Sequence, residues 1–249
     1  MPIAGHRTIA QLRKFLDENE KDQRKRDRLF IPFGGPRAEL LNKLREEILS
    51  FIISEQETLN NAVALDYGCG IQPYRLAFDQ SNVNIIAADI GHNKDAEIQI
   101  SCDNRLPFKD GTFDYVFSFQ VLEHVPIPQD YLNESFRLLQ SGGKIFLTTH
   151  GVWPFHPTPG DYHRWTKQGL IFDLELAGFK VIKTGDVLNE NSGLIQSLII
   201  NYHYKKKLKG YKRFLHHLSQ LAIRRSEKKW KRTSDIPCII SILAKKQHI

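Results

Sequence analysis

The feature that most constrains the fold is a short apolar segment, residues 62–65, which ends at Asp66 and runs into a loop. The loop spans residues 67–70 and contains two glycines, and a helical pattern follows over 74–78. Because glycine has no Cβ, a loop of this kind lets the backbone come close to a bound ligand. The order strand, glycine loop, helix therefore predicts the first unit of an α/β sheet, with a ligand site at its carboxyl end.

Strand and helix patterns alternate through the rest of the chain. Apolar segments predict strands at residues 84–88, 98–100, 113–119, 144–149, 179–187 and 238–244, and periodicity predicts helices at 129–139 and 166–177. We expect Gly142 and Gly143 to end the first of these helices. The pattern predicts a doubly wound, Rossmann-like α/β sheet that is mainly parallel, with an antiparallel last strand.

The first 60 residues differ from this alternation. One charged helical segment covers residues 9–28, glycines and prolines interrupt the chain at 32–36, and a second helix follows with apolar residues at helical spacing from Leu40 to Ile52. We expect residues 1–60 to form an N-terminal helical cap and residues 61–249 to form the main domain. That domain is expected to carry a basic helical insertion at about 203–233.

Composition places the chain among ordinary globular proteins, since 41% of its 249 residues are hydrophobic and 25% are charged. We expect no secretory signal at the start, and no apolar run approaches the ~20 residues that span a bilayer. The three cysteines, at unrelated spacings, predict neither a disulfide framework nor a zinc site. These features favour a cytoplasmic location.

A second acidic residue narrows the kind of ligand. Asp89 ends the strand after the glycine loop, where a carboxylate can accept hydrogen bonds from both hydroxyls of a ribose. A dinucleotide site would require a third glycine three positions beyond Gly70, where this chain has Pro73. The loop also lacks the Lys-Ser/Thr pair of a phosphate-binding P-loop. Both of these fingerprints are therefore excluded, whereas a plain tight turn stays open as the alternative to a ligand site.

Residues 62–187 resemble the class I S-adenosylmethionine-dependent methyltransferases, in particular the type 11-like members. The motifs that carry the resemblance are Leu65–Gly70, Asp89, the turn and strand Leu106–Asp114, the stretch Gln120–Val125 and the helix end Leu138–Gly143. The resemblance implies S-adenosyl-L-methionine as the cofactor. The cofactor-binding residues that it implies are Asp66, Gly68, Cys69, Gly70, Tyr74, Asp89, Ile90, Cys102, Asp103 and Gln120.

The sequence departs from the family pattern in two places. Gln72 occupies the position of a third glycine, as in a variant of the motif seen in a subgroup of these enzymes. The acid that contacts adenine is expected where this chain has Cys102, and Asp103 lies one position later. We expect Asp103 or the backbone of Cys102 to take that role.

The segment 149–165 is rich in histidine, proline and aromatic residues, and it follows the fifth predicted strand. It predicts either a rigid loop packed on the domain or an acceptor pocket, whose rings stack on sugars or bases. His150, His156 and His163 are the candidate catalytic bases, with Asp161 nearby. Metal binding by these three histidines is the weaker alternative, because their spacing is irregular. We expect His124 to have a structural or cofactor-side role.

The same run of His, Pro, Asp-Tyr and Arg-Trp resembles family members of surface-polysaccharide biosynthesis. It implies O-methylation of a saccharide or lipid-linked glycan. The alternatives are a methyltransferase of a small metabolite or nucleic acid, or a methyltransferase-like scaffold without catalysis. Residues 118–121 lack the Asp/Asn-Pro-Pro-aromatic motif expected for methylation of a base amine, which disfavours nucleic acid.

The positive charge of the chain is concentrated in residues 205–232. This segment holds twelve Lys or Arg and a single acid, Glu227, whereas the whole chain has a net charge of +7. Its pattern predicts one or two amphipathic helices with Leu208, Tyr211, Leu215, Leu218 and Ala222 on the apolar side. Three interpretations stay open: a solvated helix that packs on the sheet, peripheral contact with an anionic membrane, and nucleic-acid binding.

Overall fold

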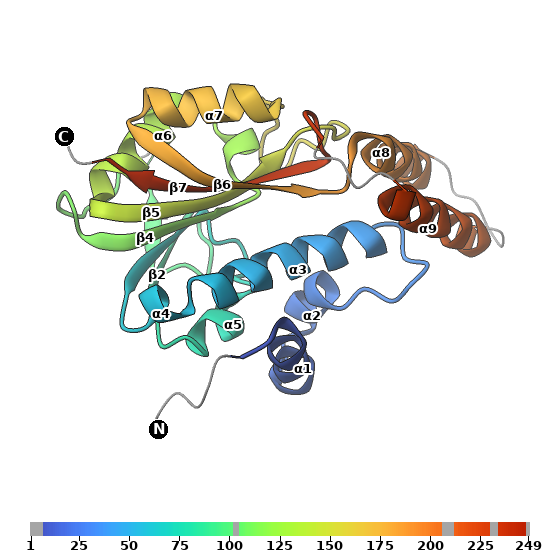
Figure 1. The fold of residues 1–249 in the computed structure, drawn as a ribbon, viewed down its shortest axis with the longest axis horizontal. Coiled ribbons are helices and arrows are strands. Elements are labelled where there is room, and N and C mark those ends of the chain that lie inside the picture. The colour runs from blue at the N-terminus through green and yellow to red at the C-terminus, as the bar shows by residue number, and fades with distance from the viewer. Residues whose placement is uncertain (1–6, 102–104, 206–211, 230–233, 248–249) are drawn as a thin grey trace.

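The computed structural model describes residues 7–101, 105–205, 212–229 and 234–247. In this part of the chain, seven strands form one sheet in the order β3-β2-β1-β4-β5-β7-β6, with helices on both faces (Figure 1). The strands are β1 (Val63–Tyr67), β2 (Asn84–Ile90), β3 (Ile98–Ile100), β4 (Phe113–Phe119), β5 (Leu139–His150), β6 (Phe179–Val187) and β7 (Ile239–Lys246). The helices are α1 (Ile9–Asn19), α2 (Gln23–Leu29), α3 (Ala38–Ser54), α4 (Gln56–Leu59), α5 (Arg75–Asp79), the 3-10 turn η1 (Leu122–His124), α6 (Pro128–Leu138), α7 (Lys167–Leu176), α8 (Glu190–Lys205) and α9 (Lys212–Lys229).

The sheet has the predicted mixed topology. The pairs β3-β2, β2-β1, β1-β4 and β4-β5 are parallel, whereas β7 is antiparallel to both β5 and β6. The chain leaves β6 at its carboxyl end and passes through α8 and α9 before β7, so the last strand runs back from that end. The prediction of a doubly wound, mainly parallel sheet with an antiparallel last strand is confirmed.

Successive residues of the central strands face opposite sides of the sheet, as a pleated strand requires. On one side, Ala64, Phe117 and Phe146 join a core with α1, α3 and α5. On the other side, Leu65, Val116 and Ile145 pack with α6 and α7. Both faces of the central strands are therefore covered, which explains their nearly continuous apolar sequence.

The N-terminal segment packs on the sheet directly. Phe51 of α3 stacks on Phe146 of β5 with ring centroids 3.9 Å apart, and the core of this face includes Leu12 and Leu16 of α1. The single helix expected over 9–28 is wrong, because α1 ends at Asn19 and α2 begins at Gln23. The side chain of Asp22 accepts a hydrogen bond from the amide of Arg24 and so starts a new helix.

The role expected for Gly142 and Gly143 is also wrong. Helix α6 ends at Leu138, and both glycines lie in the first part of β5. Here the β4-β5 register shifts, and Gly142 has a φ of +77°. A Cβ on Gly143 would stand 3.0 Å from the Asp114 carbonyl oxygen, so the glycines allow the irregular pairing rather than a helix end.

The basic insertion consists of two helices, and the first begins at Glu190, before the expected boundary. The predicted apolar side of the second helix is wrong. Leu215, Leu218 and Ala222 are exposed, whereas His216, Gln220 and Ile223 are buried. Leu208 and Tyr211 lie outside the described residues. Among the helices that are described, none is both long and apolar enough to cross a bilayer.

Candidate active site

The loops after β1 and β4 meet at the topological switch point of the sheet. Strands β2 and β3 lie on one side of β1, and β4 lies on the other side. Gly68 has a φ of +84°, and a Cβ there would stand 2.6 Å from Val121 Cγ2. The amides of Gly68 and Cys69 both donate to the Ala88 carbonyl oxygen, at 2.8 and 3.0 Å. The glycine loop is thus held between Ala88 of β2 and Val121 after β4, at the position where such sheets bind ligands.

Asp89 at the end of β2 organises this loop. Its Oδ2 accepts a hydrogen bond from the Gly70 amide at 3.0 Å, and its Oδ1 accepts one from the Ile90 amide at 2.8 Å. The side-chain amide of Asn93 donates to the same carboxylate and to the Gly70 carbonyl oxygen. A carboxylate offers about four lone-pair sites, so the three donors leave Asp89 with capacity for one ligand hydroxyl.

Asp66 gives the site its electrostatic character. Burial raises the pKa of its carboxyl to about 7, and the nearby negative charge of Asp89 adds to this effect. Burial, followed by the charges of Asp66 and Asp89, also raises the pKa of the Cys69 thiol, which is therefore neutral at pH 7. Two close carboxylates favour a ligand that carries positive charge.

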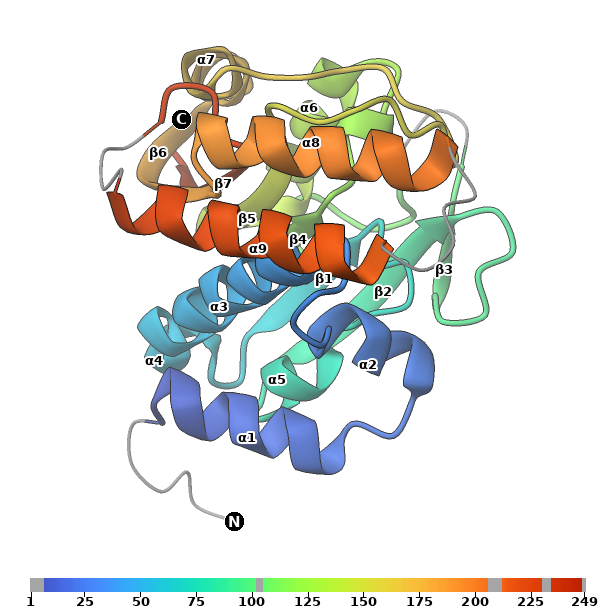
Figure 2. The ribbon, with the colours of Figure 1, turned by 90° about the vertical axis from the view of Figure 1, so that its right-hand side faces the viewer.

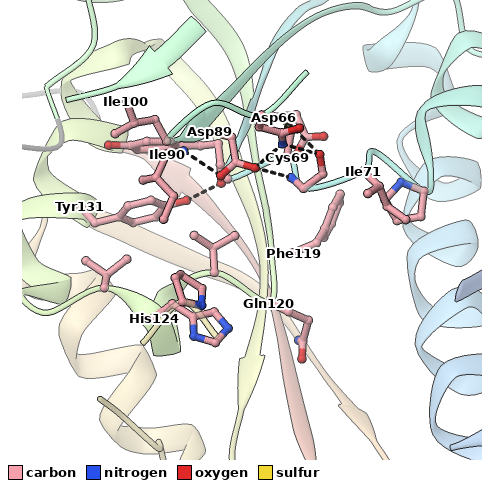
Figure 3. Close-up of a pocket in the computed structure, with 18 of the residues that line it drawn as sticks. Asp66, Cys69, Ile71, Asp89, Ile90, Ile100, Phe119, Gln120, His124 and Tyr131 are labelled. Carbon is pink, nitrogen blue, oxygen red and sulfur yellow. Dashed lines mark hydrogen bonds between the residues drawn. The ribbon is translucent and has the colours of Figure 1, made fainter. Parts of the chain in front are cut away.

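These groups line a cavity of about 1340 Å³. Figure 3 shows Asp66, Cys69 and Asp89 gathered in one part of it, with Gln120 and His124 in another. Of the residues predicted to bind the cofactor, those that line the cavity are Asp66, Gly68, Cys69, Gly70, Tyr74, Asp89, Ile90 and Gln120. Cys102 and Asp103 lie outside the described residues.

Gln72, which stands where the family often has a third glycine, adopts a backbone conformation that glycine favours. Gln72 has a φ of +50°, in the left-handed region, and its side-chain amide donates to the Asp95 carbonyl oxygen. Gln120 at the end of β4 also has a positive φ, of +60°, and its side chain donates to Thr148 Oγ1 at 3.1 Å. Side-chain hydrogen bonds thus accompany the strained backbone at both positions.

The donor set suits S-adenosylmethionine. Its methionine part carries an ammonium group and its sulfonium carries a further positive charge, and the negative charge of Asp66 and Asp89 would favour both. A Cβ on Gly70 would meet nothing within 4 Å, so the loop leaves open space at this glycine. One ribose hydroxyl matches the remaining acceptor site of Asp89.

The other end of the cavity is formed by η1 and by the loop that follows β5. His124, Ile127, Pro159, Gly160 and Tyr162 are among its lining residues. His124 Nδ1 is hydrogen-bonded to the Gly160 carbonyl oxygen, so η1 and the loop are joined at the cavity wall. His124 therefore lines the same cavity as the cofactor residues, which is compatible with the predicted structural or cofactor-side role.

An internal ion pair holds the loop in place. Arg164 binds both carboxylate oxygens of Asp161 and donates to the carbonyl oxygens of Trp153 and Pro154. Burial opposes ionisation of Asp161, but Arg164 and the amide of His156 together hold its pKa at about 2. The carbonyl oxygen of Glu123 accepts the Tyr162 amide at 2.9 Å. The loop is consequently both rigid and part of the pocket wall.

The three predicted catalytic histidines do not line the cavity. His150 is buried with Nε2 3.2 Å from Glu123 Oε1, and burial lowers its pKa well below the usual value. His156 lies behind His124, with ring centroids 4.9 Å apart, and burial followed by the charge of His124 lowers its pKa. His163 Nε2 lies 3.2 Å from the Pro126 carbonyl oxygen. Their catalytic role stays a prediction, which their positions do not support.

The histidine trio proposed as a metal site is not brought together. Within the described residues, the donor groups that lie close enough to share an ion are Glu123 with His150 and His156, and His124 with His156 and Asp161. His163 belongs to neither group. In the second group the Asp161 carboxylate is already bound on both oxygens by Arg164.

Several cavity residues were not predicted from the sequence. Arg28 of α2 and Leu41 and Leu44 of α3 line it although they precede the glycine loop by more than twenty residues. Tyr131 of α6 also lines it, stacks on Tyr67 and hydrogen-bonds to the Tyr67 carbonyl oxygen at 2.9 Å. The helical period of α6 predicts that Tyr131 faces the sheet, but the contribution of α2 and α3 has no local signal.

Comparisons with known proteins show that the chain is similar to methyltransferases. The sequence profile of the methyltransferase domain family matches residues 65–147. An uncharacterized protein of Methanocaldococcus jannaschii is 32% identical over 150 residues, which cover 57% of this chain and 65% of that protein. A ubiquinone biosynthesis O-methyltransferase of Pseudomonas aeruginosa is 30% identical over 111 residues, or 39% of this chain and 48% of that enzyme. The chain thus spans between about half and two thirds of the length of these relatives.

Solved structures share the fold at low sequence identity. The [4+2]-cyclase SpnF has a TM-score of 0.55 at 18% identity, covering 82% of this chain and 81% of its own. A sarcosine dimethylglycine methyltransferase described as putative, from Galdieria sulphuraria, has a TM-score of 0.54 at 12% identity, covering 83% and 88%. Likeness at this level shows the fold alone. The profile match assigns residues 65–147 to the methyltransferase domain family, and together with the acidic glycine-loop site it identifies S-adenosylmethionine as the cofactor.

Proposed function

We propose that this protein is an enzyme that methylates a hydroxyl group of a saccharide or lipid-linked glycan. The observation that carries the proposal is the continuity of the cavity, which is lined by Asp66 and Asp89 and also by His124 and Tyr162. Its volume of about 1340 Å³ exceeds the ~300–1,000 Å³ of a typical small-molecule site, which gives room for an acceptor beside the cofactor.

The acceptor end has groups suited to a sugar ring. Tyr162 is exposed and offers an aromatic face for stacking, while His124 and the Gly160 backbone bring polar atoms to the same wall. The sequence of this loop resembles that of polysaccharide-biosynthesis members of the family.

We assign the role of general base to His124. When bound, S-adenosylmethionine supplies a methyl group activated by the sulfonium. A hydroxyl acceptor must lose its proton as its oxygen forms the new bond to carbon. The hydrogen bond from His124 Nδ1 to the Gly160 carbonyl oxygen fixes the tautomer in which Nε2 is free to accept that proton.

The test is transfer of label from methyl-labelled cofactor to fractionated cell extract. The proposal predicts label in a saccharide or lipid-linked glycan fraction, released on acid hydrolysis as an O-methyl sugar. Label in nucleic acid, protein or a small metabolite would contradict the proposed acceptor. Absence of transfer to any fraction by protein that binds the cofactor would support a scaffold instead.

A further inference from the structure

Helices α8 and α9 form a hairpin at the carboxyl end of the sheet. They lie side by side and run in opposite directions (Figure 2). Helix α8 begins three residues after β6 ends, and β6 is parallel to β1 and β2, so the hairpin lies at the same end of the sheet as Asp66 and Asp89.

The inner face of α9 is held on α3 by polar contacts. The side chain of Gln220 accepts a hydrogen bond from the Glu39 amide at 2.9 Å, and Arg224 binds the Glu39 carboxylate. Ile223 is fully buried on this face and belongs to the apolar core beneath. The orientation of α9 is therefore fixed by specific partners.

The outer face of α9 is apolar where solvent would favour polar residues. Phe214, Leu218 and Leu221 follow one another by four and three residues, which places them on one side of the helix. They are 63%, 45% and 37% exposed. On α8, Leu194 and Leu198 are 55% and 70% exposed. An exposed group of large apolar side chains marks a surface that has a binding partner.

Basic residues continue this face. Arg225 follows Leu221 by four residues, and Lys228 and Lys229 are exposed one turn further on. The single acid of the segment, Glu227, is turned inward, where it pairs with Lys43 at 2.8 Å and accepts the Asn189 amide at 2.8 Å. The outer side of the segment therefore displays positive charge that its own acid does not offset.

We propose that the outer face of the α8–α9 hairpin docks on an anionic membrane surface. Apolar side chains beside Lys and Arg are the composition of interfacial helices, which insert the former at the headgroup boundary and pair the latter with lipid phosphates. Nucleic acid would use the charges but would leave the leucines unburied, because its backbone is contacted by polar and basic groups. The position of the hairpin would hold the active-site end of the sheet near membrane-linked acceptors, although docking itself does not depend on the acceptor.

The experiment is flotation of the full chain with phosphatidylcholine vesicles that contain or lack phosphatidylglycerol. An apolar variant carries Phe214→Ser, Leu218→Ser and Leu221→Ser. A charge variant carries Arg225→Gln, Lys228→Gln and Lys229→Gln. The matched control carries Phe172→Ser and Leu176→Ser on α7, which are both 64% exposed but belong to another helix. Thermal unfolding and cofactor binding verify that each variant is folded.

The proposal predicts that the wild type and the control float only with anionic vesicles. The charge variant should partition about 100-fold more weakly, from the attraction of three basic residues to an anionic surface, and the apolar variant should also lose binding. Three results would overturn the proposal: no flotation of the wild type, flotation of both outer-face variants at the wild-type level, or a wild-type dimer in solution that the apolar variant abolishes.

Discussion

Gly68 and Val121 are in such close contact that a Cβ on the glycine would stand 2.6 Å from Val121 Cγ2. This contact joins the loop after β1 to the loop after β4. It therefore links the cofactor side of the cavity to the stretch that leads to His124. The first prediction follows from it.

Gly68→Ala should lower the melting temperature more than Gly70→Ala does, whereas Gly70→Ala should weaken cofactor binding because its Cβ would fill the space left open for the ligand. Both glycines have a positive φ, which costs a non-glycine residue about 1–2 kcal/mol. Only Gly68 adds a steric clash, since a Cβ on Gly70 meets nothing within 4 Å. Titration calorimetry and thermal unfolding of the two variants measure the difference. Equal losses of melting temperature in both would show that the contact with Val121 has no consequence.

Asp66→Asn should stabilise the fold while it weakens cofactor binding. The carboxyl has a pKa of about 7 in the folded protein against an ordinary value of 3.8, so ionisation is disfavoured by folding. The contribution of Asp66 to the stability of the wild type therefore falls as pH rises from about 4 to about 7, and the full cost of its ionisation is present above that range.

The melting temperatures of wild type and Asp66→Asn, measured from pH 4 to pH 8, test this. The variant should gain little near pH 4 and most above pH 7. A gain that is the same at every pH, or a loss at high pH, would contradict the assigned cause.

Asp89→Ala should weaken S-adenosylhomocysteine binding by about 1–3 kcal/mol, because its hydrogen bond to a ribose hydroxyl is lost. Because Asp89 also accepts the Gly70 and Ile90 amides, the ligand should be varied as well. The 2′,3′-dideoxy analogue should bind more weakly to the wild type and lose little further affinity in the variant. If both ligands lose affinity equally in Asp89→Ala, the residue acts by holding the loop.

His124→Gln should lower turnover about 100- to 10,000-fold without a matching loss of cofactor affinity. The control is His163→Gln, because His163 lies in the neighbouring loop, beside Pro126, but does not line the cavity. Turnover is measured on the acceptor fraction identified by label transfer. Loss of turnover in His163→Gln and not in His124→Gln would return the role of base to the loop histidine.

The cofactor end of the site could be predicted because its determinants are local. Asp66 and Asp89 end adjacent strands, and strand order alone brings their carboxylates to one edge of the sheet. The conformation at Gln72 is also determined locally, since its backbone is left-handed although the residue is not glycine.

The acceptor end could not be predicted in detail because it depends on tertiary packing. His150 is the last residue of β5 and is buried away from the cavity, whereas His124 follows β4 and lies in the cavity wall, where it is hydrogen-bonded to Gly160. The prediction of which side of α9 is buried was wrong for a similar reason. Its inner face is chosen by the hydrogen bond of Gln220 to Glu39, which no apolar pattern can indicate.

The most direct test of the central claim is titration of S-adenosylmethionine into the purified chain. The expected result is saturable binding to a single site at cofactor concentrations below the millimolar range, weakened by Asp89→Ala. Absence of binding at millimolar cofactor by folded protein would contradict it.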